Sequence, residues 1–138
     1  TWHTLVDVGV VCRGPSLTEV SIWTDPVHLK SWTRQNLMDY WRPWHDRYQR
    51  LLSVARLAGL TYWPVVWGVL GVSRLHYTLA TGCITSKTGA GLYAREVFAP
   101  RWQRVINEAL LIRHGGHGSL YLSPFARRRP QLRHPQAV

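Results

Sequence analysis

The sequence predicts an all-α protein, a helical bundle of about five helices, and three observations lead to that prediction. Apolar residues recur at three- and four-residue spacing through most of the chain, which is the period of a helix with one buried face. Prolines and capping residues stand where helices would begin, and glycines stand where they would end. A chain of 138 residues, 46% of them hydrophobic, has enough apolar surface for one core and hardly enough for two.

The expected helices occupy the middle of a chain that we divide into three parts. Residues 1–23 are predicted to be a linker that forms an extended lead-in or a short strand, because several β-branched valines precede a turn at Gly14 and Pro15. Residues 24–117 are predicted to form the helical bundle domain. Residues 118–138 are a basic tail rich in proline and arginine, which we expect to be disordered.

Two helices are expected in the first half of the bundle. The first has Thr24 as its N-cap, followed by Asp25 and Pro26 in a first turn that tolerates an acid and a missing amide proton. It is expected to run to about Tyr40, and Pro43 then ends or kinks it because the residue before a proline is pushed out of helical geometry. The second helix covers about residues 44–58.

Three more helices are expected in the second half. The third covers about residues 64–79 and is apolar on most sides, which is typical of the central helix of a bundle. Thr85 or Ser86 caps the fourth, over about residues 87–98. Pro100 opens the fifth at its first turn, and a glycine-rich turn stops it.

The formal net charge of +10 indicates attraction to phosphate-rich partners or to an acidic protein surface. Four of the arginines lie in the tail, and without them the charge is +6 (10 − 4). We interpret this segment as a solvated basic tail, with a nucleic-acid-binding arm as the alternative. The four are Arg127, Arg128, Arg129 and Arg133.

Other classes of protein are not indicated. The longest uncharged run, residues 57–73, contains Pro64 and three glycines and is too short in apolar residues for a membrane span, so no membrane partner is expected. No secretion signal begins the sequence, which leaves the cytoplasm as the expected location. Cys12 and Cys83 are far apart without the spacing of zinc ligands, so we expect buried thiols and no metal site.

One segment carries a family resemblance. Residues 69–113 read VLGVSRLHYTLATGCITSKTGAGLYAREVFAPRWQRVINEALLIR. They resemble the C-terminal helical domain of the streptomycin and spectinomycin adenylyltransferases, and a weaker resemblance covers the lead-in from residue 13 to 26 and the helix after it. The resemblance implies that the N-terminal catalytic domain is missing from this sequence and would be a partner. The matching positions are Arg74, Tyr77, Thr81, Gly82, Ile84, Lys87, Ala90, Tyr93, Pro100, Trp102, Glu108 and Ala109.

The resemblance also implies that Arg74 and Lys87 lie near the nucleotide phosphates, and the residues give a physical reason for it. A helix start presents free amide protons and a positive dipole end, and Lys87 in the first turn adds a full charge. Arg74 would be folded back toward that start by the intervening turn, and Tyr77 one turn later is a third candidate for nucleotide binding. In the alternative, Arg74 pairs with an acid such as Glu96 or Glu108, Lys87 is a surface lysine and Tyr77 belongs to the core.

The chain lacks the carboxylates that adenylyl transfer requires. Enzymes of this kind hold a magnesium-bound triphosphate with acids spaced D-x-D or E-x-D after a Gly-Ser pair, and none of the seven acids here forms such a pair. No catalytic residue is therefore assigned, and ATP with Mg²⁺ is expected only together with a catalytic domain, without tight binding to this chain alone. Acids are also absent from residues 60–64, so a polycationic aminoglycoside is not an expected ligand.

Two other hypotheses stay open. In the first, the chain is a basic helical module that binds nucleic acid or an acidic protein partner. In the second, it is a structural remnant whose only property is to fold. Histidines add little: Arg129 and His134 match a short ribonuclease motif by chance, and His114 and His117 lack a carboxylate to complete a metal site.

Overall fold

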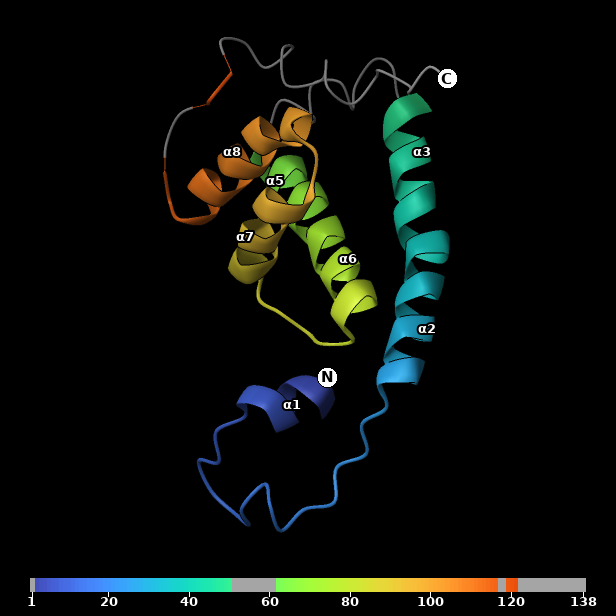
Figure 1. The fold of residues 1–138 in the computed structure, drawn as a ribbon, viewed down its shortest axis with the longest axis vertical. Helices are drawn as coiled ribbons and strands as arrows, with labels where there is room; N and C mark the ends of the chain where they lie inside the picture. Colours follow the sequence, from blue (N-terminus) through green and yellow to red (C-terminus); the bar gives the residue numbers. More distant parts are fainter. Residues whose placement is uncertain (1, 51–61, 117–118, 122–138) are drawn as a thin grey trace.

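The computed structural model describes residues 2–50, 62–116 and 119–121, and within these ranges all regular structure is helical (Figure 1). The prediction of an all-α bundle of five helices is therefore confirmed. The expectation of a disordered tail, and residues 51–58 of the second expected helix, lie outside the described residues. The division into three parts stays a prediction.

The lead-in differs from its expected form at its beginning. α1 (Trp2–Val8) is a helix that ends where the amide of Gly9 donates to the carbonyl of Leu5 at 2.9 Å. The expectation of an extended chain was wrong for these residues, because the helix propensities of ordinary residues differ by less than about 0.7 kcal/mol each, too little to decide a short segment. Residues 9–25 form no helix or strand, so the lead-in contains no short strand there.

The first two expected helices form one continuous rod (Figure 1). α2 (Pro26–Asn36) is capped by Asp25, whose carboxylate accepts from the amide of Val27 at 2.8 Å, so Thr24 was the wrong N-cap. The π-helical turn η1 (Leu37–Trp41) leads directly into α3 (Arg42–Arg50). Pro43 therefore does not end the helix, because the wider π turn just before it accommodates the missing amide proton.

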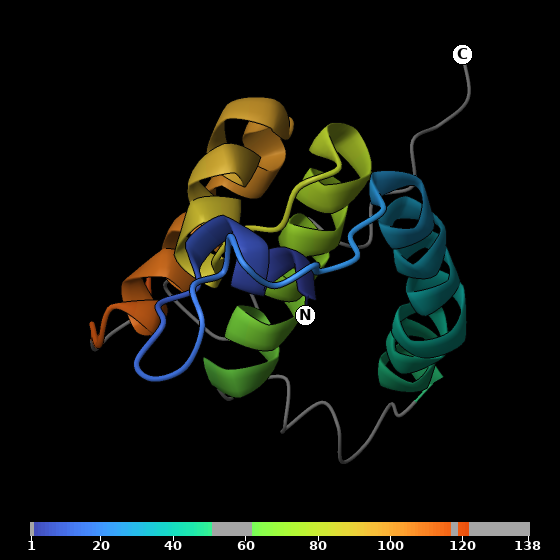
Figure 2. The ribbon, with the colours of Figure 1, turned by 90° about the horizontal axis from the view of Figure 1, so that it is seen from below.

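The central helix is a second rod with the same kind of irregularity. α5 (Tyr62–Val65) continues through the π turn η2 (Val66–Leu70) into α6 (Gly71–Thr81). Gly82 ends it with φ of 79°, a left-handed conformation that glycine adopts without strain. Figure 2 shows this rod between the α2–α3 rod and the pair α7 and α8, which confirms its central place.

The last two helices begin where the sequence predicts. α7 (Lys87–Val97) is capped by Ser86, whose hydroxyl accepts from the amide of Gly89 at 2.9 Å. The 3-10 turn η3 (Pro100–Trp102) opens α8 (Gln103–Arg113). Both predicted helix starts are confirmed.

The core lies where α7 and α8 meet the central rod. Gly91 allows α7 to lie close to α8 and to the central rod. A Cβ at this position would lie 2.9 Å from Leu110 Cγ and 2.9 Å from Leu70 Cδ2. The hairpin of α7 and α8 is antiparallel, with Gly91 facing Leu110. The buried cluster consists of Val65, Leu70, Ala94, Val105, Ile106, Ala109, Leu110 and Tyr121.

The two rods pack through an indole set against a glycine. Trp41 is buried, and a Cβ on Gly71 would lie 2.8 Å from its Cζ2 atom. Trp44 approaches Gly68 in the same way: a Cβ on Gly68 would lie 3.2 Å from the Cη2 atom of Trp44. Small residues on α6 and its π turn thus make room for the tryptophans of the first rod.

Two further expectations concern cysteines and membranes. Cys12 and Cys83 are both exposed, so the expectation of buried thiols was wrong: they lie in the lead-in and in the α6–α7 turn, and not on a packed helix face. In the parts of the chain that the structure describes, no helix has the length and apolar character needed to cross a membrane.

Candidate anion-binding site

The turn between α6 and α7 is held by an arginine. Arg74 on α6 donates from Nε to the carbonyl oxygen of Thr85 at 3.0 Å. Thr85 immediately precedes the cap residue Ser86, so this bond places the guanidinium at the start of α7. The predicted helix, tight reversal and second helix are therefore present, and Arg74 lies where the argument from sequence placed it.

Lys87, the first residue of α7, lies at the same place. Its Nζ atom is 4.7 Å from the centre of the Trp67 ring, and its side chain is half-buried. Burial lowers the pKa of the Lys87 ammonium, and repulsion by Arg113 and by Arg74 lowers it further. The two predicted cations, Arg74 and Lys87, therefore lie near one another at the start of α7.

Arg113 is a third cation at this site, and the sequence analysis missed it. Because Gly91 faces Leu110 in the antiparallel hairpin, the start of α7 faces the last turn of α8, where Arg113 stands. An arginine in the last turn of a helix is an ordinary partner of the helix dipole. The sequence position of Arg113 therefore did not identify it as a residue of the site. The register of the α7–α8 hairpin shows that it lies there.

The acids proposed as alternative partners lie elsewhere. In the described parts of the chain Arg74 forms no ion pair with Glu96 or Glu108. Glu108 is completely buried and accepts a hydrogen bond from the hydroxyl of Ser119 at 2.9 Å. The observed hydrogen bond of Arg74 is to a neutral carbonyl, which leaves the positive charge of the guanidinium uncompensated at that contact.

Tyr77 has the contacts of a packing residue. Its ring meets Tyr93 edge-on, with centroids 5.2 Å apart and planes at 89°. The Tyr93 hydroxyl is 2.9 Å from Nδ1 of His76, whose ring in turn packs edge-on against Phe98. These rings join α6 to α7, and the nucleotide-binding role of Tyr77 stays a prediction.

A tryptophan stack borders the cations. Trp67 stacks on Trp63 with centroids 5.4 Å apart and planes at 9°, and on Trp41 at 5.9 Å and 22°. Trp41 is 9% exposed and Trp63 is 57% exposed, so the stack runs from the interior to the surface. The four-residue spacing of Trp63 and Trp67 on one helix could have indicated their contact, but the contribution of Trp41 comes from another rod.

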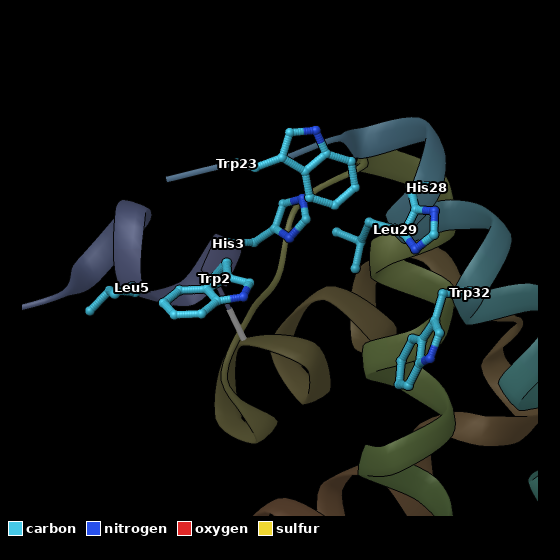
Figure 3. A pocket seen from close by; sticks show the side chains of 7 residues that line it. All are labelled: Trp2, His3, Leu5, Trp23, His28, Leu29 and Trp32. Carbon is cyan, nitrogen blue, oxygen red and sulfur yellow. The ribbon is translucent and has the colours of Figure 1, made fainter. Parts of the chain in front are cut away.

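A separate pocket of about 570 Å³ lies between α1 and the start of α2 (Figure 3). Figure 3 shows residues of α1 on one side, His28, Leu29 and Trp32 on the other, and Trp23 from the segment before α2. None of the three cations lines it. Nowhere in the described ranges do three or more histidines, cysteines or acids gather as metal ligands would.

A comparison with known families gives a match over the part of the chain that contains α6, α7 and α8. The family model described as aminoglycoside adenylyltransferase, C-terminal domain, matches residues 51–121, slightly more than half of the chain. That range contains Arg74, Lys87, Arg113 and the pair Trp63 and Trp67. Searches of curated proteins and of solved structures found no match. The weaker resemblance of the lead-in lies outside the matched range and stays a prediction.

Proposed function

Because the chain belongs to the family of aminoglycoside adenylyltransferase C-terminal domains, we propose that it is a nucleotide-binding helical domain that holds the phosphates of a nucleoside triphosphate at Arg74 and Lys87. The observation that carries this proposal is their convergence at the start of α7. The Arg74 guanidinium is held there by the Thr85 carbonyl, and the two side chains are close enough for Arg74 to lower the pKa of Lys87.

The electrostatics of the site support a polyanion as its ligand. Arg74 and Arg113 each repel the Lys87 ammonium, and a group with several negative charges relieves that repulsion when it binds. The first turn of α7 adds the positive end of a helix dipole at the same place. A triphosphate offers enough charge and enough oxygen acceptors to contact all three side chains.

Transfer chemistry would come from another part of the enzyme. When bound, Mg²⁺ would neutralise the phosphates and polarise the reacting one, and it requires carboxylate ligands that the seven acids of this chain do not supply in D-x-D spacing. In this proposal the chain's own residues bind and orient the triphosphate, and a catalytic domain supplies the metal ligands. Incubating this chain with Mg-ATP and a panel of aminoglycosides should give no adenylylated drug, and clear turnover would contradict the proposal.

A lysine substitution tests the phosphate contact directly. Calorimetric titration of the Lys87→Ala variant with ATP should show an affinity about tenfold or more below that of the wild type, since a charge-assisted contact contributes about 1.5–3 kcal/mol. The other lysine of the chain, Lys30 on α2, provides a matched control: Lys30→Ala removes the same charge and should leave the affinity unchanged. An unchanged affinity in Lys87→Ala would remove the phosphate role.

A further inference from the structure

The tryptophan stack ends on the surface beside the cations, and we propose that Trp63 is the platform on which the base of the bound nucleotide stacks. This inference rests on the proposed function, since it concerns the other end of the same ligand. Trp63 is 57% exposed although one face of its ring is covered by Trp67, which lies 5.4 Å away and nearly parallel. The exposed surface of its indole is therefore open to another planar ring.

The platform is held in place before any ligand arrives. Trp67 also stacks on Trp41, which is buried between the two rods against Gly71. A ring fixed by a buried neighbour loses little conformational entropy when a ligand stacks on it. An exposed tryptophan on a flexible segment would not offer this advantage.

The same stack connects the platform to the phosphate site. The Trp67 ring contacts Trp63 on α5 and lies 4.7 Å from the Lys87 ammonium on α7. One ligand that carries both an aromatic ring and an anionic chain can therefore contact Trp63 and Lys87 together. A nucleotide has both parts, and stacking on an aromatic side chain tolerates any base because every base has a π face.

Other small ligands fit this surface less well. A free polyphosphate would use the cations and leave the indole surface exposed. A polycationic ligand would gain contact with the tryptophan rings but would be repelled by Lys87, Arg74 and Arg113. The combination of an aromatic surface with positive charge favours an anionic aromatic ligand.

The test compares two ligands that differ in the base, ATP and inorganic tripolyphosphate, by calorimetric titration of the whole chain. The Trp63→Leu variant should bind ATP about tenfold more weakly and tripolyphosphate as tightly as the wild type. The Trp63→Phe variant, which retains an aromatic face, should recover most of the ATP affinity. Trp32 on α2 is 56% exposed and outside the stack, so Trp32→Leu is the matched control and should change neither affinity.

The outcomes separate this inference from the proposed function. If Trp63→Leu weakens both ligands equally, or neither, the base does not stack on Trp63 while the phosphate site stands. Equal affinity of the wild type for ATP and tripolyphosphate overturns the stacking in the same way. If the wild type binds neither ligand, the phosphate site itself is wrong and the platform fails with it.

Discussion

The Lys87 ammonium lies 4.7 Å from the centre of the Trp67 ring, and this contact stabilises a charge that the rest of its surroundings oppose. The face of an indole attracts a cation. Partial burial, Arg113 and Arg74 act in the other direction and lower the pKa of Lys87. Among the residues that the structure describes, no acid forms an ion pair with these cations, so a bound anion would supply the opposite charge.

The lowered pKa of Lys87 predicts how stability depends on pH. Between the lowered pKa of the folded protein and the value of 10.5 in the unfolded chain, the unfolded chain binds more protons, so the free energy of unfolding rises with pH. At neutral pH, Lys87→Met should be more stable than the wild type, because it removes a repelled charge. Denaturant titrations at increasing pH should show this difference shrinking as the pH approaches 10.5. A constant difference would mean that Lys87 has an ordinary pKa.

A second prediction concerns Arg113, the cation that the sequence did not reveal. Arg113→Gln should weaken ATP binding by about twofold to fivefold, a modest effect because this side chain is exposed to solvent. The same change should raise the pKa of Lys87, because it removes one repelling charge. Titration calorimetry measures the first effect, and NMR titration of the lysine side chain measures the second. Arg101→Gln, near the other end of α8, should do neither.

The contact between the rods predicts that a single added methyl group is costly. Gly71→Ala gains about 1 kcal/mol of helix propensity, but its Cβ would overlap the buried Trp41 ring, and overpacking costs about 1–3 kcal/mol. We expect a net loss of about 1 kcal/mol in the free energy of unfolding by denaturant titration. Gly68→Ala should cost less, since its nearest neighbour atom is 3.2 Å away. Equal stability of both variants would show that Trp41 moves aside freely.

The cap of α7 can be tested separately from its charges. Ser86→Ala removes the acceptor for the Gly89 amide and should lower the free energy of unfolding by about 1 kcal/mol. Ser86→Thr keeps a hydroxyl and should be close to the wild type. Hydrogen exchange at the Gly89 amide should be faster in the alanine variant only; the same exchange rate in all three proteins would refute the cap.

Removal of the tail separates nucleotide binding from binding to nucleic acid. Cutting off residues 122–138 removes four arginines and lowers the net charge from +10 to +6 (10 − 4). ATP affinity should stay the same, because the proposed phosphate contacts lie on α6, α7 and α8. Any binding to single-stranded RNA that depends on the tail should weaken and lose part of its salt dependence. If truncation abolishes ATP binding, the basic-module hypothesis becomes the better one.

The sequence predicts the helices best where local chemistry decides them. Ser86, Gly82 and Pro100 act within a turn of their own position, so the boundaries of α6, α7 and α8 follow from them. Thr24 and Asp25 are adjacent and both able to cap, and only the structure shows that Asp25 accepts the hydrogen bond. Pro43 was misjudged because the π turn before it depends on packing between helices.

The candidate site was predictable only in part, for a similar reason. Arg74 and Lys87 are joined by a short turn, so their proximity follows from the sequence once both helices are recognised. Arg113 and Trp41 reach the site from other elements, through the register of a hairpin and the packing of a rod. Periodicity within one helix carries no information about either relationship.

Both rods are interrupted by a π turn, in which each hydrogen bond spans one more residue than in a regular α-helix. Such a turn absorbs its extra residue locally, so the helix on either side keeps nearly the orientation of an uninterrupted rod. Trp63, which precedes the turn, therefore stays in register with α6, which follows it. The irregularity lets the second rod carry one more residue while its aromatic surface remains beside the charged one.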